Sequence, residues 1–340
     1  MEKKDLLKTV VQHIDIKSFN AIPIIDAYDK MSFSARDLAR AAKIVDMMQA
    51  DKECSTWLTL AGSTSAAGCM QIYVEMIKNN MIDAIVATGA SIVDMDFFEA
   101  LGYKHYQGSQ FVDDNQLRSL YIDRIYDTFI DEEQLQSCDT AIKTIADSLE
   151  PRPYSSREFI KEMGRYLTKH SKKKDSLVQV AFEHNVPIFC PAFSDSSAGF
   201  GLVKHQVERS EQKKPMLSLD SAKDFLELTK IKMSCNHTGL LMIGGGTPKN
   251  FAQDTVVCAE ILGKDVPKHK YAVQITVADV RDGACSSSTL KEAASWGKVE
   301  TVYEQMVFSE ATLSLPLLAS YVYHKGNWKK RQKREFAKLF

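Results

Sequence analysis

The sequence is poor in the features that mark several classes of protein. Its 340 residues include only 16 glycines and 9 prolines, and the 43 basic and 44 acidic side chains nearly cancel. A balanced charge offers no general attraction to nucleic acid or anionic lipid. No stretch reaches the roughly 18 apolar residues that a membrane-spanning helix needs. We therefore expect a soluble globular protein that binds neither nucleic acid nor membrane.

Cysteine is also sparsely used. The seven cysteines are widely spaced and form no C-x-x-C pair, and polar residues interrupt the N-terminal region through Ile16, so no signal peptide is recognised. We expect free thiols and a cytoplasmic location. Cys235 and His237 form a lone C-x-H pair without two further spaced ligands, and no metal site is expected.

Short apolar runs that end in small or polar residues are the main structural signal. The run 57–61 ends in Gly62-Ser63-Thr64-Ser65 and precedes apolar residues at helical spacing, and the run 82–87 repeats this pattern. Similar runs occupy 186–190, 239–243 and 271–277. Strands that alternate with helices favour a parallel α/β sheet, and ligands bind such sheets beyond the carboxyl ends of the strands.

Glycine-rich turns give a weak indication of phosphate or dinucleotide binding. Gly244-Gly245-Gly246 would let the backbone approach a ligand closely, and the helix from about Thr247 would present free N–H groups to an anion. The turns at Gly62 and Gly89 follow the same logic. None of them matches G-x-G-x-x-G, and each alone is more often a tight turn.

A late segment combines carboxylates, an indole and a lysine. Asp279 and Asp282 precede Glu292, Trp296 and Lys298. Carboxylates and the face of an indole hold cations, and a lysine in a poorly solvated site becomes a nucleophile toward imines and carbonyls. An isolated lysine is usually a surface residue, but this set of residue types is suited to amine chemistry.

The segment Ser295-Trp296-Gly297-Lys298, with Glu292 six residues before the lysine, resembles the deoxyhypusine synthase family, whose imine-forming lysine lies in this setting. Other segments resemble the family in the same order, and the resemblance extends from about Thr56 to about Leu318. These segments are 80–83, 186–195, 238–246 and 315–318.

The resemblance implies one Rossmann-like domain over 1–340, a doubly wound and mainly parallel α/β sheet with helices on both faces. Within it we expect an N-terminal helical extension (1–55), a helical insertion (131–183) and a basic C-terminal tail (325–340). We interpret the tail as a solvated loop and a frayed terminal helix, with a docking patch for an acidic partner as the alternative. The family also implies a homotetramer with sites shared between paired subunits.

The implied activity is an NAD-dependent aminobutyl transfer. In the family, NAD takes a hydride from spermidine, 1,3-diaminopropane leaves, and the four-carbon fragment is captured as an imine on the lysine matched by Lys298. An acceptor amine then displaces the enzyme and NADH reduces the new imine, so the redox chemistry sums to zero.

The resemblance also implies roles for individual residues. Lys298 would be catalytic, and Gly245, Asn250, Glu292, Trp296 and Asp94 would bind the polyamine substrate. The NAD contacts would be Gly62, Ser63, Ala66, Thr88, Gly89, Ala90, Asp94, Asp195, Val277, Ala278, Glu310 and Ala311.

Four positions depart from the family pattern where the polyamine is gripped. Val93 replaces a glutamate, Phe200 and Cys285 replace aspartates, and Asn250 replaces a histidine. Buried cations need paired charges, so the loss of three negative charges points to a changed substrate or acceptor. The acceptor could be a lysine of the hypusine-bearing translation factor, or free putrescine as in homospermidine synthases. A non-catalytic protein that binds NAD or polyamine is the further alternative.

Overall fold

The computed structural model describes residues 2–282 and 288–340. Its centre is a six-stranded sheet in the order β11-β10-β9-β1-β2-β7, in which every neighbouring pair is parallel. The chain runs outward from β1 to β7, returns to β9 beside β1, and then runs outward to β11, which is a doubly wound order. The strands are β1 (Cys54–Leu60), β2 (Ala84–Ala87), β7 (Ile188–Phe189), β9 (His237–Ile243), β10 (His269–Thr276) and β11 (Val299–Phe308).

The central strands have apolar side chains on both faces, as is typical of parallel sheets covered by helices. Alternate residues of β1 belong to different cores: Leu58 and Leu60 lie in the larger one, and Trp57 lies in the smaller one. The predicted α/β fold with helices on both faces is therefore confirmed.

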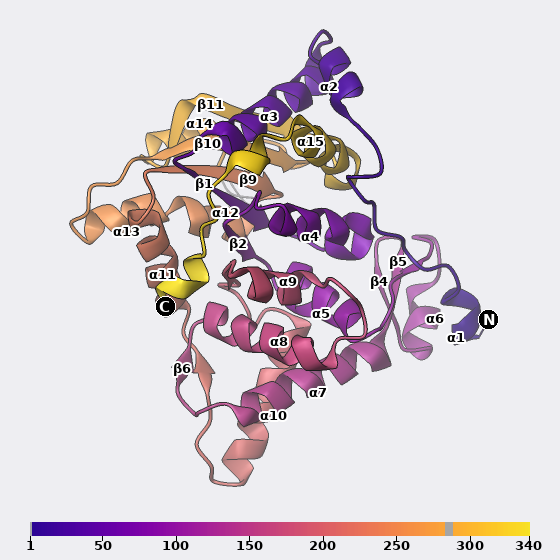
Figure 1. The fold of residues 1–340 in the computed structure, drawn as a ribbon. Helices are drawn as coiled ribbons and strands as arrows, with labels where there is room; N and C mark the ends of the chain where they lie inside the picture. Colours follow the sequence, from indigo (N-terminus) through magenta and orange to yellow (C-terminus); the bar gives the residue numbers. More distant parts are fainter. Residues whose placement is uncertain (1, 283–287) are drawn as a thin grey trace.

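Two groups of helices cover the two faces (Figure 1). The larger core includes buried side chains of α3 (Phe33–Ala50), α4 (Met70–Lys78), α5 (Met95–Ala100), α7 (Glu132–Ser148), α8 (Ser156–His170), α9 (Leu177–His184) and α15 (Ala311–Lys325). The smaller core includes side chains of α11 (Ser221–Met233), α12 (Gly246–Gln253) and α14 (Leu290–Ser295), and α13 (Thr255–Ile261) follows α12 directly. No helix in the described ranges is long and apolar enough to cross a membrane.

The region expected as an N-terminal helical extension contains α1 (Lys3–Leu6), α2 (Ile22–Tyr28) and α3. The third helix buries Ala41, Ala42, Val45 and Met48 in the larger core. This region therefore contributes directly to the packing of the sheet.

The region 131–183 is mostly helical, as expected, and contains α7, α8 and most of α9. Before it comes a small antiparallel sheet that the sequence analysis did not predict, with α6 (Asp114–Ser119) between its strands. Its strands are β3 (Tyr106–Gln107), β4 (Ile122–Ile125) and β5 (Thr128–Asp131). A short parallel pair, β6 (Pro153–Tyr154) and β8 (Ser218–Leu219), connects the region to the segment before α11, after α10 (Ser197–Glu211).

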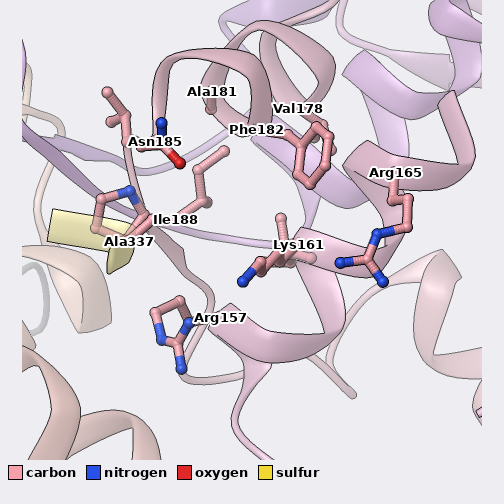
Figure 2. Close-up of a pocket in the computed structure, with 12 residues that line it drawn as sticks. Arg157, Lys161, Arg165, Val178, Ala181, Phe182, Asn185, Ile188 and Ala337 are labelled. Carbon is pink, nitrogen blue, oxygen red and sulfur yellow. The ribbon is translucent and has the colours of Figure 1, made fainter. Parts of the chain in front are cut away.

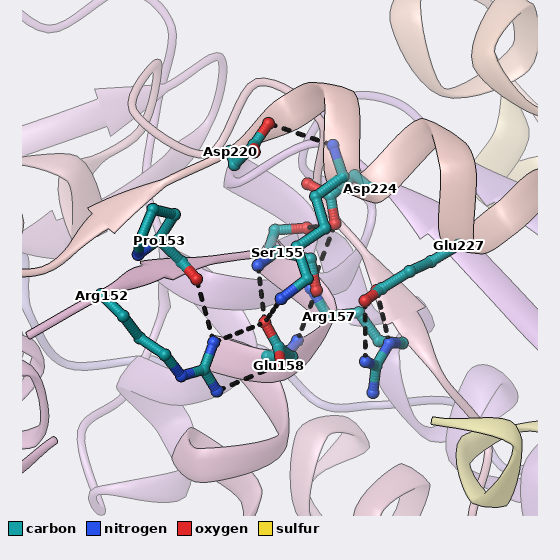
Figure 3. A network of polar contacts seen from close by, with 10 residues as sticks. Arg152, Pro153, Ser155, Arg157, Glu158, Asp220, Asp224 and Glu227 are labelled. Carbon is teal, nitrogen blue, oxygen red and sulfur yellow. Dashed lines mark hydrogen bonds and ion pairs between the residues drawn. The ribbon is translucent and has the colours of Figure 1, made fainter. Parts of the chain in front are cut away.

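A buried polar network ties the start of α8 to α11 (Figure 3). Arg157 donates two hydrogen bonds to Glu227, from Nε to Oε2 at 2.7 Å and from Nη2 to Oε1 at 3.1 Å. Asp224 Oδ1 accepts from the Ser156 hydroxyl at 2.9 Å. Because both charges of the Arg157–Glu227 pair are buried and joined by two bonds, this pair fixes α8 against α11.

The C-terminal tail is anchored, and the expectation of a solvated loop with a frayed helix is wrong. After α15 ends at Gly326 (φ 75°), short 3₁₀ turns form at Asn327–Lys330 and Phe336–Leu339. The Arg331 guanidinium is buried against Asp83, and Phe336 enters the smaller core. The basic composition of the tail did not reveal these buried contacts, because the residues that the tail contacts are far away in the sequence.

Candidate active site

The carboxyl ends of the strands meet at one edge of the sheet, here named the cofactor edge and defined by the turns after β1, β2, β9, β10 and β11. The Ser91 hydroxyl donates to the Gly62 carbonyl oxygen, which joins the first two turns. The Gly244 amide donates to the Ile275 carbonyl oxygen at 2.8 Å, which joins the turns of β9 and β10. The predicted turn residues Gly62, Ser63, Ala66, Thr88, Gly89 and Ala90 all lie at this edge.

Asp94, expected to bind NAD or an amine, caps α10. Its carboxylate accepts from the amides of Ser197 (3.1 Å) and Ala198 (2.9 Å), and the residue is only 6% exposed. Burial raises the pKa of the Asp94 carboxyl, and the two amide bonds oppose that rise. The neighbouring Val93 is buried in the larger core.

The remaining residues expected to contact NAD differ in exposure. Asp195 and Val277 are exposed, and Ala278 and Ala311 are partly exposed. Glu310 caps α15 by accepting from the Leu313 amide at 3.2 Å. Of the positions that depart from the family pattern, Phe200 is 62% exposed on α10, and Cys285 lies outside the described residues.

A cleft of about 1200 Å³ lies along α12 and contains the predicted catalytic lysine. We name it the lysine cleft. Gly246 lies at one end, and α13 and α14 contribute walls. The remaining lining residues are Phe225, Thr247, Asn250, Phe251, Asp254, Val257, Cys258, Ile261, Ser288, Glu292, Ser295, Trp296 and Lys298.

Lys298 is nearly buried and surrounded by polar partners. Its Nζ lies 2.5 Å from Asp254 Oδ1 and donates to Asn250 Oδ1 at 3.4 Å. The Asn250 amide in turn donates to Asp254 Oδ2 at 2.9 Å, so the three side chains form a closed polar ring. The Trp296 ring, 67% exposed, has its centroid 5.4 Å from Lys298 Nζ. A cation is therefore held here by one carboxylate, one amide and an indole face.

Glu292 lies at the start of α14 in the same cleft. Its carboxylate accepts from the Thr289 backbone amide at 2.6 Å, and this bond lowers the pKa of the Glu292 carboxyl. The side chain remains exposed and can face an incoming amine. The predicted residues Asn250, Glu292, Trp296 and Lys298 are thus brought together, and Gly245 directly precedes the helix that carries Asn250.

Two further residues were missed from the sequence: Asp254 lines the lysine cleft, and Lys249 lies buried near Glu292 and Lys298. Asp254 follows Asn250 by four residues, and that helical spacing was a readable signal for a shared face. Lys249 is fully buried; it donates to Gln274 Oε1 at 2.9 Å and to the Ser288 carbonyl oxygen. Burial lowers the pKa of Lys249 to about 8; the nearby Glu292 opposes this, and Lys298 adds to it.

The lysine cleft and the cofactor edge are separated within one chain. The His269 amide, at the first residue of β10, donates to the Lys298 carbonyl oxygen at 2.9 Å, so Lys298 lies at the amino ends of the strands. A parallel strand rises by about 3.3 Å per residue, which puts Lys298 roughly 23 Å from the far end of β10. A single chain therefore does not bring Lys298 to the residues that are expected to contact NAD.

A second, smaller cavity of about 240 Å³ lies between α8, α9 and the tail (Figure 2). Arg157, Lys161 and Arg165 follow one another along α8, and the Arg165 guanidinium lies 6.0 Å from the centroid of the Phe182 ring of α9. No acidic side chain lines it among the described residues. Because a polyamine needs negative partners, this cavity is not a candidate for the polyamine site.

Comparisons with known proteins agree on one family. The family model for deoxyhypusine synthase matches residues 23–322. A "Deoxyhypusine synthase-like protein" of Coxiella burnetii is 68% identical over 339 residues, covering 99% of this chain and 96% of the relative. The corresponding protein of Caulobacter vibrioides is 66% identical, with 100% and 93% covered.

A more distant relative and a solved structure extend the comparison. "Probable deoxyhypusine synthase 2" of Methanosarcina mazei is 39% identical, covering 94% of this chain and 91% of the relative. A crystal structure assigned as a deoxyhypusine synthase of Entamoeba histolytica superposes with a TM-score of 0.62 at 18% identity, covering 95% and 99% of the two chains. At that identity the superposition establishes the fold alone.

Proposed function

The chain belongs to the deoxyhypusine synthase family, and from that premise we propose that it is an NAD-dependent aminobutyl transferase acting on a polyamine. The observation that carries this proposal is Lys298, which combines burial in the lysine cleft with a carboxylate and an indole beside its Nζ. A lysine in such a place suits covalent capture of a four-carbon fragment as an imine.

The residues of the cleft have distinct tasks in this proposal. Glu292 and the face of Trp296 would hold the protonated amines of the substrate, and Lys298 would attack the carbon that becomes the imine. The aromatic and aliphatic walls, including Phe225 and Ile261, would contact the methylene chain. The cleft therefore combines apolar walls with a small number of placed charges, as polyamine recognition requires.

The cofactor edge is suited to NAD. Gly62 has a φ of 77° and no atom within 4 Å of the position that a Cβ would take, so a ligand can approach the backbone closely. When bound, NAD would accept a hydride from the donor amine and return it to the product imine. Exposed Asp195 would offer a carboxylate to the ribose hydroxyls.

The separation between Lys298 and the cofactor edge supports an oligomer with shared sites. Hydride transfer requires the donor carbon to lie in contact with the cofactor, but about 23 Å separates the two regions within one chain. A paired subunit would supply the cofactor edge to the lysine cleft. We therefore include a homotetramer, or at least a dimer, in the proposal.

The acceptor amine has two candidates, a lysine of the hypusine-bearing translation factor and free putrescine. Asp254 is already paired with Lys298, and Val93 and Phe200 supply no charge, so few carboxylates remain for a substrate. This scarcity favours a small diamine acceptor, and homospermidine synthesis is the second candidate function. A protein that binds NAD or polyamine without catalysis is the remaining alternative.

The activity can be tested by trapping the covalent adduct. The protein is incubated with NAD and spermidine and then treated with borohydride, and the Lys298 peptide is measured by mass spectrometry. We expect an aminobutyl adduct on Lys298 and release of 1,3-diaminopropane. Lys298→Ala and Lys298→Arg should form no adduct, because alanine lacks the amine and a guanidinium stays protonated.

Product analysis then separates the acceptors. Homospermidine after addition of putrescine, without labelling of the translation factor, supports the diamine reaction, and the reverse result supports protein modification. Failure to form the adduct with any polyamine, or full activity of Lys298→Ala, would reject the transferase. Polyamine or NAD binding without diaminopropane release would indicate the non-catalytic alternative.

A further inference from the structure

We propose that Asp254 is a catalytic residue that moves a proton between Lys298 and the departing amine when the aminobutyl group is captured. The proposal rests on the proposed function and adds a residue to it. Asp254 Oδ1 contacts the reacting atom itself, Lys298 Nζ, at 2.5 Å. No other carboxylate within the described ranges forms an ion pair with Lys298.

The position of Asp254 is fixed by its surroundings. It lies at the junction of α12 and α13, and its side chain caps neither helix. Asn250, one helical turn earlier, donates to the second carboxylate oxygen at 2.9 Å. One oxygen of Asp254 is thus held by an amide while the other faces Lys298, which is the arrangement expected of a positioned proton acceptor.

The other polar groups around Lys298 are less suited to this task. Asn250 has no titratable group. Lys249 is cationic below its pKa of about 8, and its Nζ is directed to Gln274 and Ser288. Glu292 accepts from the Thr289 amide, and in the part of the chain that the structure describes it forms no ion pair with Lys298. Asp254 is therefore the group that can exchange a proton with Lys298 directly.

The step balances without any further reagent. The Lys298 ammonium passes one proton to Asp254, and the neutral amine adds to the protonated imine carbon of the oxidised polyamine. Asp254 then returns the proton to the diamine nitrogen of this adduct. Asp254 next takes the second proton from the Lys298 nitrogen, the bond from carbon to the diamine nitrogen breaks, and a protonated imine joins the four-carbon fragment to Lys298. Asp254 gives this second proton to the departing diamine, which leaves as an ammonium. No electrons are gained or lost in this exchange.

The test compares Asp254→Asn, Asp254→Glu and a matched control, Glu260→Gln. Glu260 is exposed on α13, does not line the lysine cleft and loses the same charge. Thermal unfolding of each variant checks that it folds. Two readouts follow: turnover of spermidine, and labelling of Lys298 by butanal with cyanoborohydride across pH, which needs neither NAD nor polyamine.

For Asp254→Asn we expect spermidine turnover and labelling of Lys298 to change in opposite directions. Turnover should fall about 100-fold, within the usual range for a lost acid–base group, while KM changes little. Labelling of Lys298 should become faster, because its Nζ is no longer held in an ion pair with a carboxylate. Asp254→Glu should restore part of the turnover, and Glu260→Gln should match the wild type in both readouts.

Several results would overturn the proposal. An unchanged labelling profile in Asp254→Asn would mean that the ion pair does not form. If labelling of Lys298 changes in Asp254→Asn but turnover stays within about threefold of the wild type, the carboxylate moves no proton. If the wild type turns over no polyamine, the catalytic role fails together with the proposed function, and the labelling profile then reports separately on the ion pair.

Discussion

Replacing Arg331 by methionine should destabilise the protein strongly, although the residue lies in the basic tail. Arg331 Nη2 lies 2.5 Å from Asp83 Oδ2 and also donates to the Cys54 carbonyl oxygen at 3.2 Å, and Nη1 donates to the Asn80 carbonyl oxygen. Both side chains of the ion pair are 1% exposed. Methionine would keep much of the volume and remove all of these bonds.

The expected loss in the free energy of unfolding depends on which partners Asp83 keeps after Arg331 is replaced. Removing one partner of a buried ion pair typically costs about 3–5 kcal/mol, because the other charge stays buried without compensation. Asp83 Oδ2 still accepts from the Thr56 amide at 2.7 Å, so we expect a cost near the lower limit, about 3 kcal/mol. A typical unfolding free energy is about 5–15 kcal/mol, which makes this loss easy to measure.

Urea unfolding at one fixed protein concentration measures the effect, and a double-mutant cycle isolates the ion pair. The Arg331→Met and Asp83→Asn double variant should lose about 2 kcal/mol less than the sum of the single variants. Lys333→Met is the matched control, because Lys333 is exposed and forms only a 3.6 Å surface contact with Glu335; its change should stay within about 0.5 kcal/mol. A cost below about 1 kcal/mol for Arg331→Met would refute the reasoning.

Two further substitutions test buried charges. Lys249 has a pKa of about 8 in the folded protein, against an ordinary value of 10.5. The unfolded chain therefore binds more protons between these two values, and the free energy of unfolding rises with pH there by up to about 1.4 kcal/mol per pH unit from this residue. Lys249→Met should remove that contribution in urea unfolding at pH 8.5 and 9.5, and equal slopes in both proteins would contradict the assignment. Asp94→Ala should cost about 1–2 kcal/mol in the same assay at neutral pH, because α10 loses its cap, and an unchanged midpoint would show that the cap contributes nothing.

The sequence predicted the central sheet well because its strands are buried on both faces. The runs in β1, β9 and β10 are nearly continuous in apolar residues, which periodicity detects directly. β11 was not predicted, since it lies at the sheet edge and only Val299 and Val307 are buried. The strands of the small antiparallel sheet have only two to four residues, too few for a periodic signal.

The candidate site was predicted in its residue types but not in its geometry. The motif around Lys298 predicted that this lysine, the indole of Trp296 and Glu292 lie together, because these residues are close in the sequence. The ion pair between Lys298 and Asp254 joins residues that are 44 positions apart. It depends on how α12 packs beside the start of β11, and no local sequence pattern encodes that packing. For Asp94 the family resemblance predicted a ligand contact, which stays a prediction, and the structure adds a cap on α10 that the sequence did not reveal.

The pairing of Asp83 with Arg331 has a consequence for synthesis of the chain. The two residues are 248 positions apart, and a ribosome adds roughly 5–20 residues per second, so Asp83 precedes its partner by about 12–50 s. During that time a carboxylate destined for the interior beside β2 has no guanidinium to receive it. We expect the nascent protein to keep this part of the sheet open to water until Arg331 has been added.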